Sequence, residues 1–303
     1  MAHLSESDTI YGVMVRSNVL LPAGAGGTRK WLAFTTCFIL GMAVSLSADT
    51  LSEVRDARRV HAVDIRVFDG ELTIVGSDTD ELRVEGEVTG NDGYIDVEAA
   101  RGGYRITVRR RDRPGTPSSD LTVTLPARTH LHLESGNADV SMSGLEGRVS
   151  VKGRRGDIDL EYGGSREVDV YTTSGGIAIA ADTLHNVRAR SADGAISVTA
   201  GGAGAVKLRS TGGDIDLSVD RFRRGNIDLR NTSGTTRLTL GGRSAAWIHM
   251  PRRGAEVSPS PDQAEGAGFG AVEERARLAY RVGGGFGEVY ISSTGGNIEL
   301  AID

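Results

Sequence analysis

The feature that most constrains the fold of this chain is a repeat of nineteen to twenty-one residues in its second half. Each unit has a Val-x-Val pair, a turn rich in Ser, Thr and Gly, and then Gly-x-Ile-x-Leu. The alignment places the repeat glycine at Gly136, Gly156, Gly175, Gly194, Gly213, Gly234 and Gly296. Repeats of this length indicate a stacked array, because one unit is too small to bury its own apolar face.

The apolar residues of each unit alternate with polar ones, which is typical of half-buried β-strands. The inward pairs of the first strand are Leu131/Leu133, Val149/Val151, Val168/Val170, Val187/Ala189, Val206/Leu208, Ile227/Leu229 and Val289/Ile291. Those of the second strand are Ala138/Val140, Ile158/Leu160, Ile177/Ile179, Ile196/Val198, Ile215/Leu217, Thr236/Leu238 and Ile298/Leu300. With 42 glycines and only 5% aromatic residues, the sequence predicts an all-β fold whose core is Val, Ile and Leu.

Two all-β architectures fit such units: an antiparallel meander of hairpins, or a solenoid in which each unit is one coil. In a solenoid, the outward residues Ser150, Asp169, Arg188, Lys207 and Asp228 stack in a column that brings opposite charges together. The nearly constant spacing also suits coils that overlay. We therefore favour a single-domain β-solenoid (β-helix-like) of 19–21-residue coils with a divergent N-terminal β region.

Residues 1–48 are interpreted as an N-terminal extension and signal peptide. Arg29 and Lys30 precede an apolar run at residues 31–44, and small residues follow it, which is the order of a secretory signal. The run is shorter than the roughly 20 residues of a membrane span. Because the part before Arg29 is long for a signal, either the true start lies downstream, with Met14 as one candidate, or the segment is an uncleaved anchor.

The rest of the chain divides by its pattern into three parts and one insertion. Val63, Ile65, Leu72 and Ile74 have the spacing of a degenerate first unit. The predicted boundaries are a polar lead-in at 49–60, a divergent β region at 61–130 that caps the array, and solenoid repeats at 131–303 with an insertion at 243–288. The basic, Pro-containing segment 109–119 is predicted to be an exposed loop.

Several short strings resemble one known family. They are Ser-Thr-Gly-Gly-Asp-Ile-Asp-Leu at 210–217, its copy Ser-Thr-Gly-Gly-Asn-Ile-Glu-Leu at 293–300, Leu-Thr-Val-Thr-Leu-Pro at 121–126 and Gly-Gly-Gly-Phe-Gly at 283–287. In their order and period they resemble the bacterial putative-adhesin β-strand-repeat family, a domain of unknown function, over roughly residues 60–303. The resemblance implies a secreted or envelope protein with a β-solenoid-like fold, and it implies no catalytic residues.

One acidic patch is a candidate metal site, formed by Asp139, Asp157 and Asp159. The repeat alignment sets Asp139 beside Asp159, and calcium requires six to eight oxygen ligands. Asp214 would lie three coils from Asp157, about 14 Å away at the usual strand spacing, and could not share an ion with it. The alternative is that these carboxylates are solvated face residues that limit aggregation. The histidines are scattered, and no catalytic residue, cofactor-binding residue or cofactor is predicted.

These observations predict a secreted or periplasmic/cell-envelope structural or binding module, a putative adhesin without catalytic activity and without a transmembrane span in the mature chain. Its partner would be an envelope glycan or another envelope protein. Nucleic acid is not expected, because the net charge is −5. A carbohydrate-active β-helix enzyme and a membrane-anchored sensory ectodomain remain alternatives. Exposed aromatic residues for sugar stacking would distinguish the enzyme, and Trp247 is the only tryptophan after residue 48.

Overall fold

The computed structural model describes residues 49–90, 93–110, 116–163, 167–251, 270–274, 277–284 and 286–302. The chain divides into two units, Met1–Val44 and Ser45–Asp303, and every described residue belongs to the second. The expected signal segment therefore lies outside the described residues. The regular elements of the described part are all β-strands, which confirms the all-β prediction, and this part has no apolar helix that could cross a membrane.

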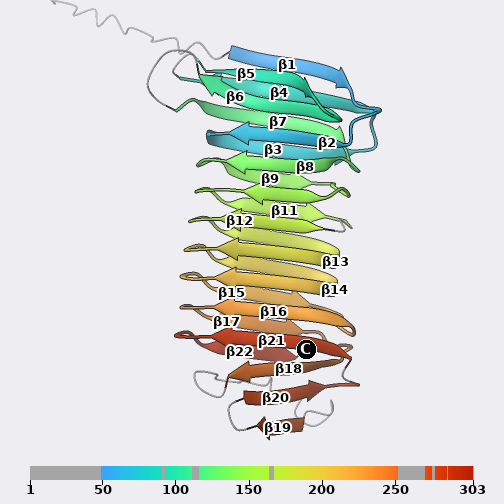
Figure 1. Cartoon of the computed structure of the whole chain (residues 1–303), viewed down its shortest axis with the longest axis vertical. Helices are drawn as coiled ribbons and strands as arrows, with labels where there is room; N and C mark the ends of the chain where they lie inside the picture. Colours follow the sequence, from blue (N-terminus) through green and yellow to red (C-terminus); the bar gives the residue numbers. More distant parts are fainter. Residues whose placement is uncertain are drawn as a thin grey trace, which may run out of the picture. The chain divides into compact units, whose positions relative to one another are not determined.

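The strands follow one another closely along the chain (Figure 1). They are β1 (Asp49–Asp56), β2 (Ala62–Val67), β3 (Asp69–Ser77), β4 (Glu81–Thr89), β5 (Gly93–Ala100), β6 (Gly103–Arg110), β7 (Ser118–Pro126), β8 (His130–Ser135), β9 (Asp139–Ser143), β10 (Val149–Lys152), β11 (Ile158–Tyr162), β12 (Val168–Thr172), β13 (Ile177–Ser191), β14 (Ile196–Ser210), β15 (Ile215–Val219), β16 (Gly225–Asn231), β17 (Thr236–Leu240), β18 (Ala246–Pro251), β19 (Gly270–Glu274), β20 (Arg277–Val282), β21 (Gly287–Ser293) and β22 (Ile298–Ile302).

Equivalent strands of successive repeats pair in parallel, as coils require and hairpins do not. Val168 of β12 lies between Val149 of β10 and Val187 of β13, for example. The pairings define two rows. The first-strand row contains β8, β10, β12, the second halves of β13 and β14, β16 and β21. The second-strand row contains β9, β11, the first halves of β13 and β14, β15, β17 and β22.

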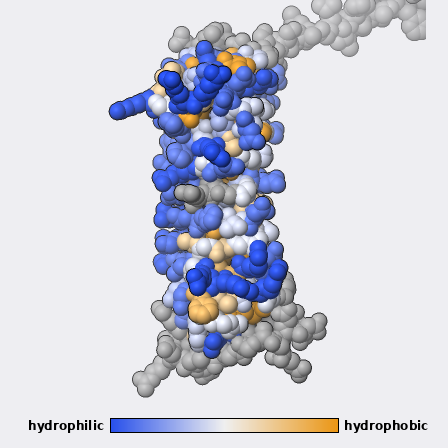
Figure 2. Space-filling view, turned by 90° about the vertical axis from the view of Figure 1, so that its right-hand side faces the viewer, coloured by the Kyte–Doolittle hydropathy of each residue, from blue (hydrophilic) through white to orange (hydrophobic). Residues whose placement is uncertain are grey.

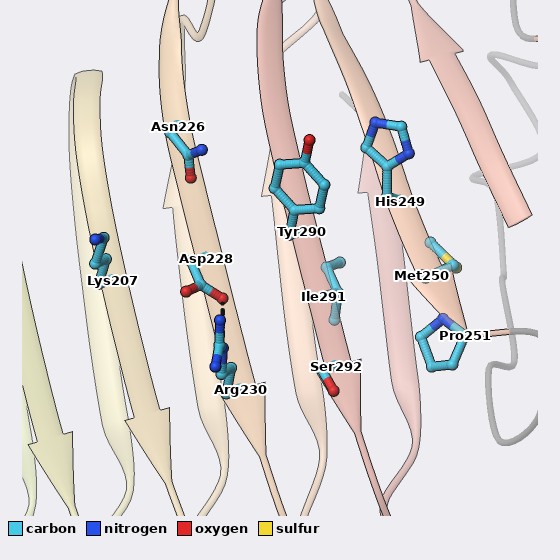
Figure 3. Close-up of a pocket in the computed structure, with 10 residues that line it drawn as sticks. All are labelled: Lys207, Asn226, Asp228, Arg230, His249, Met250, Pro251, Tyr290, Ile291 and Ser292. Carbon is cyan, nitrogen blue, oxygen red and sulfur yellow. Dashed lines mark hydrogen bonds and ion pairs between the residues drawn. The ribbon is translucent and has the colours of Figure 1, made fainter. Parts of the chain in front are cut away.

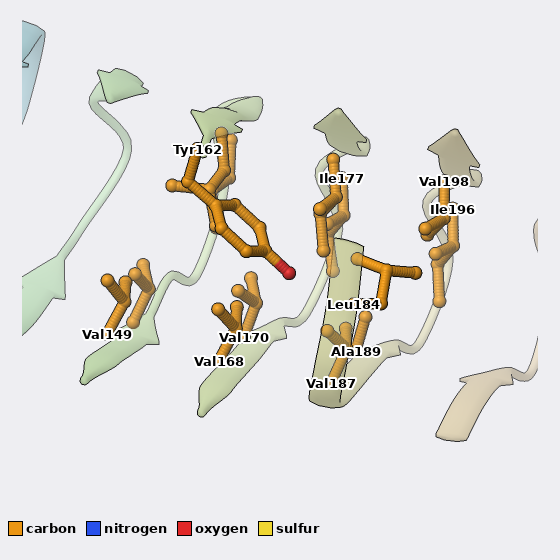
Figure 4. Close-up of a cluster of buried hydrophobic side chains, with 14 of the residues drawn as sticks. Val149, Tyr162, Val168, Val170, Ile177, Leu184, Val187, Ala189, Ile196 and Val198 are labelled. Atoms are coloured by element: carbon orange, nitrogen blue, oxygen red, sulfur yellow. The ribbon is translucent and has the colours of Figure 1, made fainter. Parts of the chain in front are cut away.

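The core lies between the two rows. All the inward residues predicted for the seven units are buried, including the polar Thr236. Figure 4 shows Val168 and Val187 of one row opposite Ile177 and Ile196 of the other. Each coil thus buries apolar side chains against its two neighbours, so its stability depends on theirs.

The repeat glycines form a column in which each backbone passes close to the coil before it. A Cβ added at Gly194 would lie 1.8 Å from the carbonyl oxygen of Gly175, and one added at Gly175 would lie 1.9 Å from that of Gly156. Gly213 and Gly296 approach their neighbours in the same way. The glycine of the motif is therefore required by the close approach of stacked turns.

The structure corrects the predicted register at one unit. Val140 pairs with Ile158, and Met142 with Leu160, so this unit is displaced by two residues from the sequence alignment. Ala138, not Gly136, occupies the place of the repeat glycine, because the added Cβ of Gly156 would meet the Ala138 carbonyl oxygen at 2.3 Å. A shift of two residues leaves apolar residues inward in both registers, which is why the pattern did not reveal it.

At the N-terminal end, the coil of β2 and β3 lies between the strands β6 and β7 on one side and β8 and β9 on the other. Antiparallel strands then cover the outermost layer: β5 pairs with β6, β4 with β7, and β1 with β4. The segment 49–60 is thus not only a polar lead-in, because it contains β1. The predicted loop 109–119 is likewise shorter, since Arg109 and Arg110 belong to β6.

At the C-terminal end, the order in space differs from the order in sequence. β21 and β22 stack directly on β16 and β17, although residues 243–288 intervene in the chain. The strand β18 pairs with the other edge of β21, and β20 and β19 follow it in antiparallel pairing. The described strands β18, β19 and β20 of the insertion therefore lie beyond the last coil, where they cover an edge that would otherwise be free to pair.

Candidate functional site

Two of the acidic residues proposed as a metal site, Asp139 and Asp157, accept hydrogen bonds from the backbone of a neighbouring coil. Oδ1 of Asp139 accepts the N–H of Asp157 at 2.9 Å, and Oδ1 of Asp157 accepts the N–H of Gly176 at 2.7 Å. Asp214 does the same for Thr235 at 2.7 Å. The aspartate that follows the repeat glycine thus has a structural role of its own, since each bond satisfies a backbone donor.

The predicted neighbour of Asp139 is wrong. Asp159 lies opposite Ser141, and Asp139 lies next to Asp157 and opposite Glu71. Within the described ranges, no three His, Cys, Asp or Glu side chains are grouped so that they could hold a metal ion. The metal site at Asp139, Asp157 and Asp159 remains a prediction from the sequence.

The outward surfaces of the two rows, here called the first-strand face and the second-strand face, differ in charge. Across the coils that begin with β10 and end with β17, the first-strand face carries Lys152, Asp169, Arg188, Arg190, Lys207, Arg209, Asp228 and Arg230. The second-strand face carries Asp157, Asp159, Glu161, Asp214, Asp216 and Arg237 over the same coils. One face of the stack is therefore mainly basic and the other mainly acidic.

Register places five of these cations side by side. Arg190 lies opposite Arg209, and Arg209 lies opposite Arg230. In the adjacent column, Arg188 lies opposite Lys207. We call these five residues the cationic ladder. In the adjacent column, Asp169 also lies opposite Arg188 and Asp228 opposite Lys207. The column of Arg190, Arg209 and Arg230 places only like charges opposite each other, which is unfavourable on neighbouring strands, so this column is not explained by the stability of the sheet.

Asp228 is an acidic residue beside the cationic ladder, opposite Lys207. Its carboxylate accepts a bond from Nε of Arg230 at 2.9 Å and lies 3.9 Å from Arg209. The hydrogen bond to Asp228 raises the pKa of the Arg230 guanidinium, which stays charged at any physiological pH. The predicted column from Ser150 to Asp228 is confirmed in register. Its ion pairs differ from those expected, because Arg188 pairs with Glu167 at 3.9 Å.

A groove of about 570 Å³ lies at the C-terminal end of the ladder (Figure 3). It crosses β14, β16, β21 and β18, and its lining comprises Lys207, Asn226, Asp228, Arg230, His249, Met250, Pro251, Tyr290, Ile291 and Ser292. Ser292 is the neighbour of Arg230 on the next coil, and its short side chain leaves the groove open there. The buried Met250 and Ile291 contribute apolar surface to the lining.

Aromatic rings stand beside this groove. The Tyr290 ring is 40% exposed and stacks on the His249 imidazole, with centroids 4.8 Å apart and planes inclined by 13°. Nε2 of His249 is 2.9 Å from a carboxylate oxygen of Glu288, which holds the imidazole in place. Trp247, on the same strand, lies under the Arg281 guanidinium at 5.7 Å.

A second exposed ring, that of Tyr171, lies at the other end of the ladder. It is 44% exposed and lies opposite Arg190. Neither Tyr171 nor Tyr290 was singled out from the sequence, although both occupy outward positions of the repeat. Alignment of the outward columns, not only of the inward ones, would have identified them.

The other basic and histidine candidates have local partners. Arg109 pairs with Asp96 at 2.8 Å and Glu98 at 3.4 Å. Nδ1 of His130 accepts the N–H of Arg148 at 3.1 Å, and His132 lies 3.6 Å from Glu134. Figure 2 shows one side of the stack, on which hydrophilic residues predominate and apolar residues gather near the two ends.

Several solved structures resemble this one. A putative cell adhesion protein from Clostridium sporogenes ATCC 15579 is 11% identical, over 85% of this chain and 100% of that chain, with a TM-score of 0.27. A putative adhesin from Bacteroides fragilis NCTC 9343 is 12% identical, over 84% and 98%, with a TM-score of 0.37. One from Parabacteroides merdae ATCC 43184 is 13% identical, over 82% and 95%, with a TM-score of 0.31.

No curated protein matches this chain. Residues 116–246, which run from the start of β7 to the start of β18, match the family described as Toastrack DUF4097. The predicted resemblance to a bacterial domain of unknown function is confirmed for this segment, which is similar to the Toastrack family.

Proposed function

We propose that this chain is a β-solenoid binding module of the bacterial envelope, and that its first-strand face is the binding surface. The observation that carries the proposal is the combination on one face of an open groove, two exposed tyrosines and a run of cations. Tyr and Arg are the residue types that supply most of the binding energy at protein interfaces.

The parallel stack suits this role because it holds outward side chains at fixed positions. Neighbouring strands lie about 4.8 Å apart, so every coil repeats the positions of the previous one. A surface that is already ordered loses little conformational entropy when a ligand binds. Since the core residues belong to the inward positions, the outward residues can serve recognition without weakening the fold.

The proposed location in the bacterial envelope rests on the sequence. The basic pair Arg29 and Lys30 before the apolar run 31–44 is typical of a secretory signal, and no cysteine follows that run. Cell fractionation, with mass spectrometry of the N-terminus, tests it. We expect the protein in the envelope or the medium, with cleavage near residue 48. Retention of the protein in the cytoplasm would contradict this part of the proposal.

The binding role is tested with the purified full chain and insoluble envelope fractions from bacteria, namely cell wall and membranes. We expect sedimentation with one fraction and a loss of at least tenfold in bound protein for Tyr290→Ala. The matched control is Thr239→Ala on the second-strand face, which removes a half-buried side chain from the opposite row and should bind as the wild type does. Absence of binding to every fraction would refute the proposed function.

A further inference from the structure

We propose that the first-strand face binds a linear anionic polysaccharide that runs along the stack, perpendicular to the strands. Its acidic groups would lie on the cationic ladder, and one sugar ring would enter the groove beside Tyr290. This inference rests on the proposed function, because it names the ligand class of the same surface.

The positive charge of the cationic ladder favours an anionic partner. Arg190 and Lys207 have no carboxylate within 4.0 Å among the described residues. Arg188 and Arg209 each have one ion pair, with Glu167 and Asp228 respectively, and both pairs are 3.9 Å long. Asp139, Asp157 and Asp214 of the other face, by contrast, each accept a backbone N–H. Guanidinium groups bind carboxylate, sulfate and phosphate through two parallel hydrogen bonds, so arginines in a column can each take one acidic group.

The spacing of the ladder suits a polymer. Tyr171, Arg190, Arg209, Arg230 and Ser292 lie on five successive coils. Four steps of about 4.8 Å give a track of about 19 Å along the stack. On the three middle coils of this track, a chain with one acidic group on each sugar would meet one arginine for each coil that it crosses.

The aromatic residues favour a polysaccharide over other polyanions. Tyr171 stands at one end of the arginine column. Tyr290 lies at the C-terminal end of the adjacent column, opposite Asp228, and its ring borders a recessed groove with apolar surface in its lining. The apolar face of a sugar ring can pack on such a ring while its hydroxyls reach Asn226, Asp228 and Ser292. A bilayer presents a plane that would not fill the groove.

The experiment measures binding of the purified full chain to polygalacturonate, which has a carboxylate on each sugar. Fully methyl-esterified polygalacturonate is the neutral control, polyphosphate is the polyanion without sugar rings, and dextran sulfate distinguishes sulfate from carboxylate. We expect at least tenfold weaker binding to the esterified polymer and to polyphosphate, and weaker binding in high salt. Equal binding to polyphosphate, or to double-stranded DNA, would overturn the inference.

Variants locate the site on the surface. Arg190→Ser with Arg209→Ser should weaken binding of the acidic polymer at least tenfold, and Tyr290→Ala should weaken it while leaving any residual polyphosphate binding unchanged. The matched control is Arg237→Ser on the second-strand face, where the arginine is similarly exposed. Unchanged binding in the double variant would refute the placement. Circular dichroism and the melting temperature report whether each variant folds.

The outcomes separate this inference from the proposed function. If the chain binds an envelope fraction but no acidic polysaccharide, the ligand class is wrong and the binding role stands. If the ladder variants abolish self-association of the protein in sedimentation and leave polysaccharide binding intact, the face is an interface between copies of the chain, and the inference is overturned.

Discussion

The column of stacked turns and the two outward faces belong to the same repeat, but they differ in which side chains each position accepts. In the turns, Gly156, Gly175, Gly194, Gly213 and Gly296 lie so close to the preceding coil that no side chain fits. On the faces, equivalent positions hold Arg, Lys, Asp, Ser or Ala, and the register is the same throughout. The contrast shows that stacking constrains the turn and the inward residues, while the outward residues are free to specialise.

The largest expected effect is in the turns. Gly194→Ala would place a Cβ 1.8 Å from the carbonyl oxygen of Gly175. Because Gly194 does not have a positive φ, backbone strain would not contribute to the loss of stability, and the steric clash alone would cause it. We expect a loss of about 3 kcal/mol in the free energy of unfolding, or a failure to fold. The control is Ser197→Ala, three residues along the chain on the exposed face.

Chemical denaturation of both variants checks this comparison. Ser197→Ala should change the free energy of unfolding by less than about 0.5 kcal/mol, because the side chain is exposed. Similar stabilities of the two variants would mean that the stacked turns can move apart, and the contrast between turns and faces would be lost.

A smaller effect of opposite sign is expected in the core. The Tyr162 side chain points between the rows (Figure 4), and its hydroxyl is buried with no hydrogen-bond partner among the described residues. Tyr162→Phe removes that unpaired group and should stabilise the protein by about 1 kcal/mol. Thermal melting at neutral pH measures it, and a destabilisation would indicate a hydrogen bond to the hydroxyl.

The same residue predicts a pH dependence. Burial raises the pKa of Tyr162 above its ordinary value of 10.0, whereas the unfolded chain ionises near that value. The contribution of the neutral phenol is therefore fully present below pH 10 and is lost as the pH rises above it. The difference in stability between Tyr162→Phe and the wild type should grow above pH 10, and a constant difference would contradict the assignment.

A further prediction compares an aspartate that follows the repeat glycine with its neighbour on the same face. Asp214→Ala removes the acceptor of the Thr235 N–H and should cost about 1 kcal/mol in the free energy of unfolding. Asp216→Ala, two residues later, removes a partner of Arg237 at 3.4 Å on the exposed surface and should cost less. Denaturant titration measures both changes. A larger loss for Asp216→Ala than for Asp214→Ala would contradict the structural role given to Asp214.

The smallest expected effect concerns calcium. Asp139 and Asp157 already accept backbone N–H groups, so each has an oxygen that is engaged in the fold. We expect millimolar calcium to leave the melting temperature unchanged. A rise that disappears in Asp139→Ala with Asp159→Ala would establish the metal site that the sequence suggested.

The strands and the core followed from the sequence because a period of two is a direct consequence of strand geometry. The inward residues of all seven units were identified in this way, and each is buried. The face proposed for binding was not identified, because Tyr290 is 100 residues from Arg190 in the sequence, and Tyr171, Arg190 and Tyr290 share only an outward position. Nothing in a linear pattern distinguishes an exposed residue that binds from one that is merely solvated.

The sequence by itself determined the length of the coil, the inward residues and the position of the repeat glycine in six of the seven units, since these features recur along the array. The tertiary structure alone decided the rest. It set the register at Val140 and Ile158, where either alignment buries apolar residues. It also placed β21 on β16 and left β18 to β20 beyond it. The reason is that a free strand edge can pair with a strand from anywhere in the chain, and a linear pattern does not specify which one.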